Sequence, residues 1–237
     1  MRTRRWVVVC SALCAVTAAV VVAYALETAP TAAPVVAAQK FVLVDAKGSP
    51  RGAMAVGSDG QPMLVLSDER GNIRAALSLD VHGQPTLRLN DEKGLLRAGL
   101  MLDDQGRPAL RLGDGNGQVR AELALGLRDQ PKLALADANS DVRVTLALQP
   151  GGEPAVALLD GKGVVRATLG LSSDGLGGLA ISDAAGNQRV TLTATANGFS
   201  KLVLSDEKGE PRVAALYGNG PRLELRDPSG TVLWQAP

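Results

Sequence analysis

The sequence predicts an all-β repeat protein, built from tandem 23-residue units of two strands each, and two observations support this prediction. First, aspartate recurs every 23 residues from Asp45 to Asp206, and a ninth, Asp227, follows after 21 residues. Second, apolar residues alternate with small or polar residues on both sides of each aspartate. This alternation is typical of a half-buried strand and excludes an amphipathic helix.

Each aspartate begins a predicted turn. The side chain of an aspartate at the first position of a type I turn accepts hydrogen bonds from backbone N–H groups of that turn, and a glycine three residues later takes a positive φ. Such a glycine stands in every unit except one, where Ser140 replaces it. A second turn is predicted around a glycine fifteen residues after the aspartate, as at Gly60, usually with proline two residues later. One unit is therefore strand, Asp-x-x-Gly turn, strand and Gly-x-Pro turn.

The alternation also predicts how the strands pair. The apolar faces coincide if the residue two before each aspartate pairs with the residue five after it, as Leu66 with Ile73. This pairing requires a two-residue loop between aspartate and glycine. For the second turn, the residue eleven after the aspartate is expected to pair with the residue four before the next aspartate, as Val56 with Leu64. The resulting sheet has one leucine-rich face and one face of small residues.

An antiparallel β-meander is the expected arrangement of these strands, and a β-solenoid with one unit per coil is the alternative. A solenoid stacks equivalent residues about 4.8 Å apart, so its aspartates and arginines would form rows of like charges that repel. A meander roughly doubles that distance. On either arrangement, residues 40–237 form a β-repeat domain of eight units plus a partial ninth.

The N-terminal segment predicts export. Three arginines among the first five residues precede an uncharged run of 21 residues, from Trp6 to Leu26, which as a helix would span a bilayer. The positive-inside rule then keeps the N-terminus in the cytoplasm, with residues 1–26 as a signal-anchor. A cleaved signal peptide is the alternative, since Ala23-Tyr24-Ala25 has the form of a cleavage site. Residues 27–39 are an Ala- and Pro-rich linker.

Both interpretations place the repeat domain outside the cytoplasm. The first predicts a single-pass membrane protein with an extracytoplasmic repeat domain, and the second predicts a protein secreted after cleavage. Both cysteines, Cys10 and Cys14, lie in the N-terminal apolar run. We therefore expect no disulfide in the repeat domain.

The sequence does not predict an enzyme. The single histidine, His82, falls at a variable turn position, and no serine or threonine of the small face has a base beside it. Neither a phosphate loop nor a Cys/His cluster occurs. We therefore expect no catalytic residue, no metal and no cofactor. The net charge of +1 also argues against nucleic acid as a partner.

A row of arginines, six residues after each aspartate, is the candidate binding site. Guanidinium groups suit bidentate binding of carboxylate or phosphate, so the row could bind a cell-surface glycan or another anionic envelope polymer. The alternative is that each arginine pairs with acids of the turns, such as Asp68 or Glu69. The row comprises Arg51, Arg74, Arg97, Arg120, Arg143, Arg166, Arg189 and Arg212.

Taken together, these patterns predict an exported, membrane-anchored structural or interaction module that self-associates. Surface ligand binding through the arginine row is the alternative function. Burying one large apolar side chain is worth about 1.5–3 kcal/mol, and a monomer rarely leaves a large apolar face in water. The outermost strands also leave edges that a second chain could extend. We therefore expect a homo-oligomer, anchored in the membrane through residues 6–26 where these are not cleaved.

Overall fold

A computed structural model describes residues 37–237, except residues 196 and 219. These residues form 18 strands and one short 3-10 helix, η1 (Leu127–Asp129). The strands are β1 (Lys40–Val44), β2 (Pro50–Val56), β3 (Pro62–Ser67), β4 (Ile73–Leu79), β5 (Pro85–Asn90), β6 (Leu96–Leu102), β7 (Pro108–Gly113), β8 (Val119–Leu125), β9 (Pro131–Ala136), β10 (Val142–Leu148), β11 (Pro154–Leu159), β12 (Val165–Leu171), β13 (Gly177–Ser182), β14 (Gln188–Ala194), β15 (Ser200–Ser205), β16 (Pro211–Tyr217), β17 (Pro221–Arg226) and β18 (Val232–Ala236).

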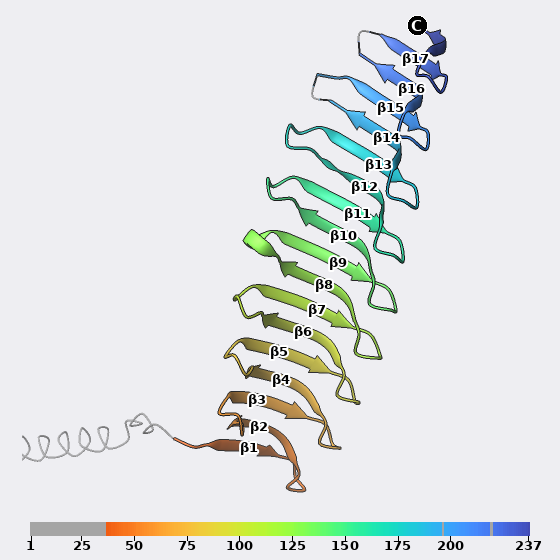
Figure 1. The fold of residues 1–237 in the computed structure, drawn as a ribbon. Coiled ribbons are helices and arrows are strands. Elements are labelled where there is room, and N and C mark those ends of the chain that lie inside the picture. Colours follow the sequence, from red (N-terminus) through yellow and green to blue (C-terminus); the bar gives the residue numbers. More distant parts are fainter. Residues whose placement is uncertain (1–36, 196, 219) are drawn as a thin grey trace, which may run out of the picture. The chain divides into compact units, whose positions relative to one another are not determined.

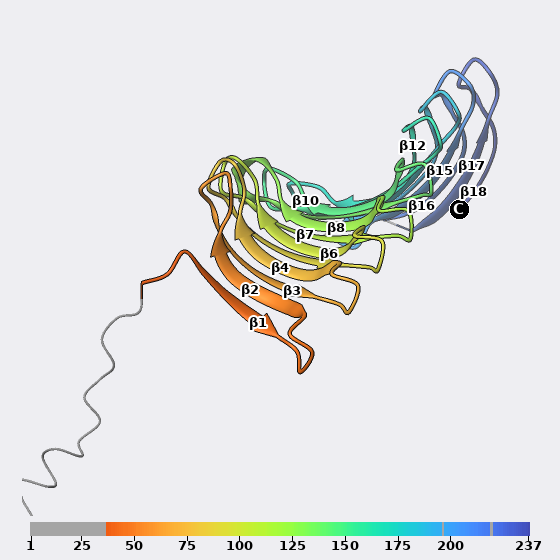
Figure 2. The same cartoon turned by 90° about the horizontal axis from the view of Figure 1, so that it is seen from below.

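The strands form one antiparallel meander. Each strand pairs with its neighbours in sequence, from β1 with β2 to β17 with β18 (Figure 1). Figure 2 shows that the repeat domain is a single curved layer of strands. The predicted meander is therefore confirmed, and the alternative of a solenoid with one unit per coil is wrong.

The first turn of each unit is longer than predicted. In the second unit the Asp68 N–H donates to the Asn72 carbonyl (3.0 Å), and the Gly71 N–H donates to the Asp68 carbonyl (3.0 Å). These bonds close a five-residue loop in which Gly71 has a φ of 85°, as in a type I turn followed by a glycine bulge. The two-residue loop that the alternation predicted is wrong.

Each first turn is followed by a β-bulge at the arginine of the unit. Ser67 pairs with Ile73 and Leu66 pairs with Ala75, so Arg74 lies between two pairs without a partner of its own. The longer turn and the bulge each shift the pairing by one residue, and the two shifts add. The predicted pair Leu66–Ile73 is therefore wrong by two residues, but the leucines keep the same face.

This bulge recurs in all nine hairpins, with Leu233 in place of arginine in the last one. The second turn differs from its prediction by the same amount. Val56 pairs with Pro62 and not with Leu64, and a five-residue loop with a positive φ at Gly60 joins the strands. A shift of two residues again preserves the face, so the predicted leucine-rich face is confirmed.

We call this surface the Leu face; it consists of two rows of residues that run across the strands. Neither row contains a charged residue. One row is Leu43, Gly52, Leu66, Ala75, Leu89, Ala98, Leu112, Ala121, Leu135, Val144, Leu158, Ala167, Ile181, Val190, Leu204, Val213, Leu225 and Trp234. The other row is Phe41, Met54, Leu64, Leu77, Leu87, Leu100, Leu110, Leu123, Leu133, Leu146, Val156, Leu169, Leu179, Leu192, Leu202, Ala215, Leu223 and Ala236.

Nothing in the described residues covers the Leu face. Leu100, Leu146 and Leu169 are 51%, 50% and 58% exposed. The opposite surface, which we call the small face, carries mostly alanine, threonine and glycine, which alternate with the Leu-face residues along each strand. The buried side chains of the described residues all lie on the small face, and they are Ala109, Val203, Ala214 and Glu224. The small face therefore holds the most buried side chains of the described residues, whereas many leucines of the Leu face are exposed.

The predicted anchor over residues 6–26 lies outside the described residues, as does nearly all of the predicted linker over residues 27–39. From residue 37 onward, in the part that the structure describes, no helix is long and apolar enough to cross a bilayer.

Candidate interaction surface

The repeated aspartates hold the turns, as predicted. Asp45 Oδ1 accepts hydrogen bonds from the backbone N–H groups of Lys47 (2.9 Å) and Ser49 (3.0 Å). The bond from Ser49, followed by that from Lys47, lowers the pKa of the Asp45 carboxyl. Asp114 and Asp160 accept equivalent bonds, and their pKa values are lowered for the same reason. Each carboxylate therefore replaces a backbone partner that its turn lacks.

These lowered pKa values predict that the fold is sensitive to acid. Asp103 shows the largest effect, because the Arg107 guanidinium donates to its carboxylate (2.8 Å) and lowers its pKa to about 2. An unfolded aspartate has a pKa of about 3.9. Below that value the unfolded chain binds more protons than the folded chain, so stability is complete above about pH 4 and falls as the pH approaches about 2.

Urea unfolding at pH values between 6 and 2 tests this expectation. The urea concentration at the unfolding midpoint should stay constant from pH 6 to about pH 4 and decline at lower pH. The decline should be shallower in Asp103→Asn. A midpoint that does not change down to pH 2 would contradict the proposed role of the turn carboxylates.

The predicted arginine row lies at the bulges, and all eight arginines pair with the aspartate of their own unit. Arg120 lies 3.2 Å from Asp114 and Arg166 lies 3.4 Å from Asp160. In each case the carboxylate uses Oδ1 for the turn backbone and Oδ2 for the arginine. One aspartate thus stabilises the turn and the bulge together.

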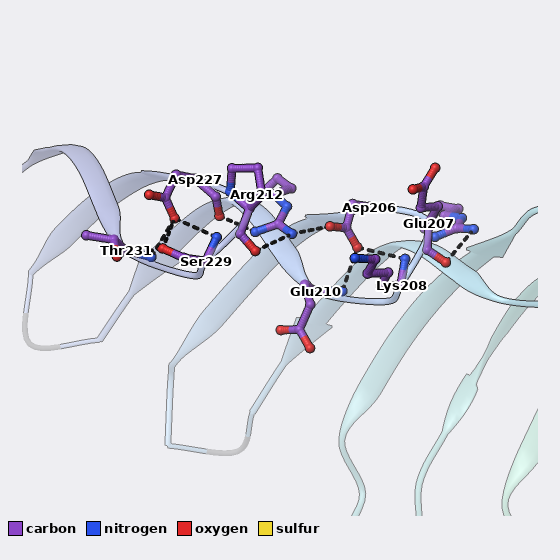
Figure 3. Close-up of polar contacts among 10 residues, drawn as sticks. Asp206, Glu207, Lys208, Glu210, Arg212, Asp227, Ser229 and Thr231 are labelled. Atoms are coloured by element: carbon purple, nitrogen blue, oxygen red, sulfur yellow. Dashed lines mark hydrogen bonds and ion pairs between the residues drawn. The ribbon is translucent and has the colours of Figure 1, made fainter.

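Six of these arginines also donate to a backbone carbonyl of the following unit. Arg120 Nε donates to the carbonyl of Ala136 (2.9 Å), which lies next to the aspartate of the following unit. Figure 3 shows the same arrangement for Arg212, which contacts the Asp206 carboxylate and the Asp227 carbonyl. These six arginines therefore join successive hairpins on the side of the sheet where the first turns lie.

The sequence suggested part of this arrangement. The fixed spacing of six residues between aspartate and arginine indicated pairing with turn acids, but the bond to the next unit depends on where the bulge places the arginine. Each guanidinium is already partnered within the chain, with side-chain exposures from 20% to 49%. Binding of an anionic polymer by this row stays a prediction.

The small face carries isolated ion pairs between its short residues. Arg111 Nε donates to Glu122 (2.6 Å) across β7 and β8. Glu224 is 1% exposed and lies between Arg226 (2.7 Å) and Arg222 (2.5 Å). The Arg226 hydrogen bond lowers the pKa of the Glu224 carboxyl, and Arg222 adds to that effect. In the described part of the chain, no three His, Cys, Asp or Glu side chains converge in the manner of a metal site.

The Leu face is a large uncharged surface of the repeat domain. Eighteen strands at about 4.8 Å spacing, with about five residues of 3.3 Å each, give a face on the order of 1,400 Å². The largest apolar patch on a typical monomer is roughly 300–600 Å². The face is hollowed between β10 and β14, where Leu146, Leu169 and Leu192 line a groove of about 460 Å³. A surface of this size and composition resembles one half of a protein core.

No protein-family model and no curated protein sequence matches the chain. Among solved structures, it is similar to the wild-type TCP10 domain of Danio rerio CPAP, with 15% identity over 77% of this chain and 98% of that chain and a TM-score of 0.28. It is also similar to the TCP domain of Drosophila melanogaster SAS-4, in complex with a proline-rich motif of Ana2, with 13% identity over 80% and 97% of the two chains and a TM-score of 0.35. Neither similarity carries an argument about function, which is therefore inferred from this chain's own surface.

Proposed function

We propose that this chain is an exported structural module whose repeat domain self-associates through the Leu face, while residues 6–26 hold it at the membrane. The observation that supports this proposal is the uncovered Leu face, an uncharged surface with half-exposed leucines on strand after strand. A cleaved N-terminal segment would give the same module in secreted form.

The area of the Leu face suits a second copy of the chain. Two such faces packed together would bury up to roughly 2,800 Å², by the same strand dimensions. Stable protein interfaces bury about 1,200–2,000 Å², so even partial overlap is sufficient. Two sheets pack about 10 Å apart with interdigitated side chains, and two copies of one face related by a two-fold axis match each other by symmetry. The assembly would be a β-sandwich with one sheet from each copy.

An N-terminal anchor would favour the same association. Copies held in one membrane share a plane and a high effective concentration, so a modest affinity between faces is sufficient for assembly. The near-neutral charge of the chain also leaves little repulsion between copies.

The proposal predicts that lysines on the Leu face abolish association. Leu146→Lys with Leu169→Lys places two charges in the centre of the face, and each would lose its hydration in the sandwich. Sedimentation of residues 37–237 should give a dimerisation Kd raised at least about tenfold, which corresponds to 1.4 kcal/mol.

The matched control is Thr145→Lys with Thr168→Lys, one residue earlier on the same two strands and on the small face. It should associate like the unchanged protein. Equal weakening in the two double variants, or a monomeric unchanged protein at about 100 µM, would contradict the proposal.

A further inference from the structure

Among the described residues, the two outermost strands of the sheet each have one unpaired edge. In the described residues β1 pairs only with β2, and β18 pairs only with β17, and Figure 1 shows them at opposite ends of the sheet. Phe41 of β1 and Trp234 of β18 are 48% and 49% exposed. Proteins commonly protect an edge with proline or with several charges. Lys40 is the single charged residue of the two strands, and neither contains proline.

The two edges are complementary in strand type. β1 is the first strand of a hairpin, and β18 is the second strand of one. Inside the sheet every second strand pairs with the first strand of the next hairpin in one constant register. β6 with β7 is an example, where Ala98 lies opposite Leu112 and Leu100 lies opposite Leu110. The free side of β18 is therefore the side that pairs, elsewhere in the sheet, with a strand of the β1 type.

We infer that β18 of one copy pairs with β1 of the next copy in this interior register, so that copies join head to tail in one continuous sheet. The constant register places Trp234 opposite Leu43 of the next copy and Ala236 opposite its Phe41. Gln235 then lies opposite Val42 of the next copy on the small face. The antiparallel direction and the position of the Leu face continue unchanged through such a junction.

The side chains of the two edges fit this pairing. The residue equivalent to Trp234 is glycine, alanine or valine in every earlier unit. The residue equivalent to Ala236 is leucine or methionine in seven of the eight earlier units. At the junction the small Ala236 leaves room opposite Phe41, while Trp234 reaches Phe41 along the diagonal of the strand pair. An aromatic pair at that separation adds to the apolar contact. The last unit thus departs from the repeat where it would meet the large residue of β1.

This contact differs from association through the Leu face. A head-to-tail contact joins two different surfaces, so every addition leaves the same two edges free, and the product is an open filament rather than a closed dimer. It requires no Leu-face contact, and therefore it stands apart from the proposed function.

Disulfide formation between cysteines at Gln235 and Val42 tests the register in the full chain. Cys10 and Cys14 are first replaced by serine, and Gln235→Cys is combined with Val42→Cys. Antiparallel partners lie about 4.5–5.5 Å apart at Cα, within the range of a disulfide. Within one chain the two positions are separated by the whole sheet, roughly 80 Å, so a bond forms only between copies. Oxidation of the full chain in the cells that express it should give covalent dimers, trimers and longer species, seen as a ladder on a non-reducing gel.

The control combines Gln235→Cys with Lys40→Cys, two residues further along the same face, where the Cα separation rises to about 7–8 Å. Its ladder should be at least about tenfold weaker. The inference would be overturned if the two combinations gave equal ladders or if no covalent product formed. It would also be overturned if the Gln235→Cys and Val42→Cys pair gave only dimers and either cysteine alone gave the same dimers. Adding Leu146→Lys and Leu169→Lys should leave the ladder in place, which separates this result from the test of the Leu face.

Discussion

Deleting one complete unit, Asp91–Gly113, should leave a folded sheet of lower stability, whereas deleting Glu92–Gly113, one residue fewer, should disrupt it. In a single-layer meander each strand pairs only with its two neighbours, so stability is roughly a sum over units and their contacts. The 23-residue deletion joins Asn90 to Asp114 and keeps the next turn, its glycine and its bulge intact. The remaining strands then pair in the register that the whole sheet uses.

The 22-residue deletion leaves Asp91 directly before Asp114, and neither aspartate gives an acceptable turn. A turn at Asp114 moves Leu87 and Leu89 to the small face and brings Arg88 onto the Leu face. A turn at Asp91 places Arg120 seven residues after the aspartate, in a row of the Leu face that otherwise holds apolar residues.

Thermal unfolding followed by circular dichroism, together with limited proteolysis, compares the two deletions. We expect the shorter deletion to melt roughly 5–10 °C below the longer one, which for a domain of this size corresponds to a few kcal/mol. Coincident melts and digestion patterns would mean that the sheet absorbs a single residue without changing faces.

The sequence predicted the faces of the sheet correctly and its register incorrectly, for one reason. Side chains alternate with a period of two, so a shift of one residue would have reversed the pattern around Asp68, but a shift of two leaves it unchanged. Nothing in the alternation from Ala75 to Leu79 distinguishes a short turn without a bulge from a longer turn with one. The arginine itself was the available signal, because a constant large residue beside a turn is compatible with an unpaired bulge position.

The interaction surface was predictable in composition but not in environment. The two apolar rows could be read directly from the repeat, and so could the absence of charge within them. Whether a second layer covers those rows depends on the path of the whole chain, and the described residues provide no such layer. The interaction of Arg120 with Ala136 in the next unit was unpredictable for a related reason, since it depends on the offset that the bulge creates.

Gly117→Val should lower the melting temperature much more than Arg120→Ala, although both residues belong to the same turn region. Gly117 has a φ of 78°, and a β-branched residue is strongly disfavoured there. A Cβ at this position would also meet the Leu95 side chain at 3.3 Å. Strain of this kind costs about 1–3 kcal/mol. Arg120→Ala removes only partly exposed contacts, to Asp114 and to the Ala136 carbonyl, and such contacts stabilise a fold weakly.

Ser140 allows the same argument to be tested in the opposite direction. Ser140 is the residue of the next unit that is equivalent to Gly117, and it has a φ of 67°. Its backbone is therefore already in the left-handed conformation, which is strained for a residue with a Cβ. Ser140→Gly should therefore raise the free energy of unfolding by roughly 1 kcal/mol, because the left-handed conformation costs an ordinary residue about 1–2 kcal/mol. Urea unfolding of the three variants under one set of conditions compares them directly. If Ser140→Gly is destabilising, or if Gly117→Val and Arg120→Ala unfold at the same urea concentration, the positive φ is not what makes glycine necessary in this turn.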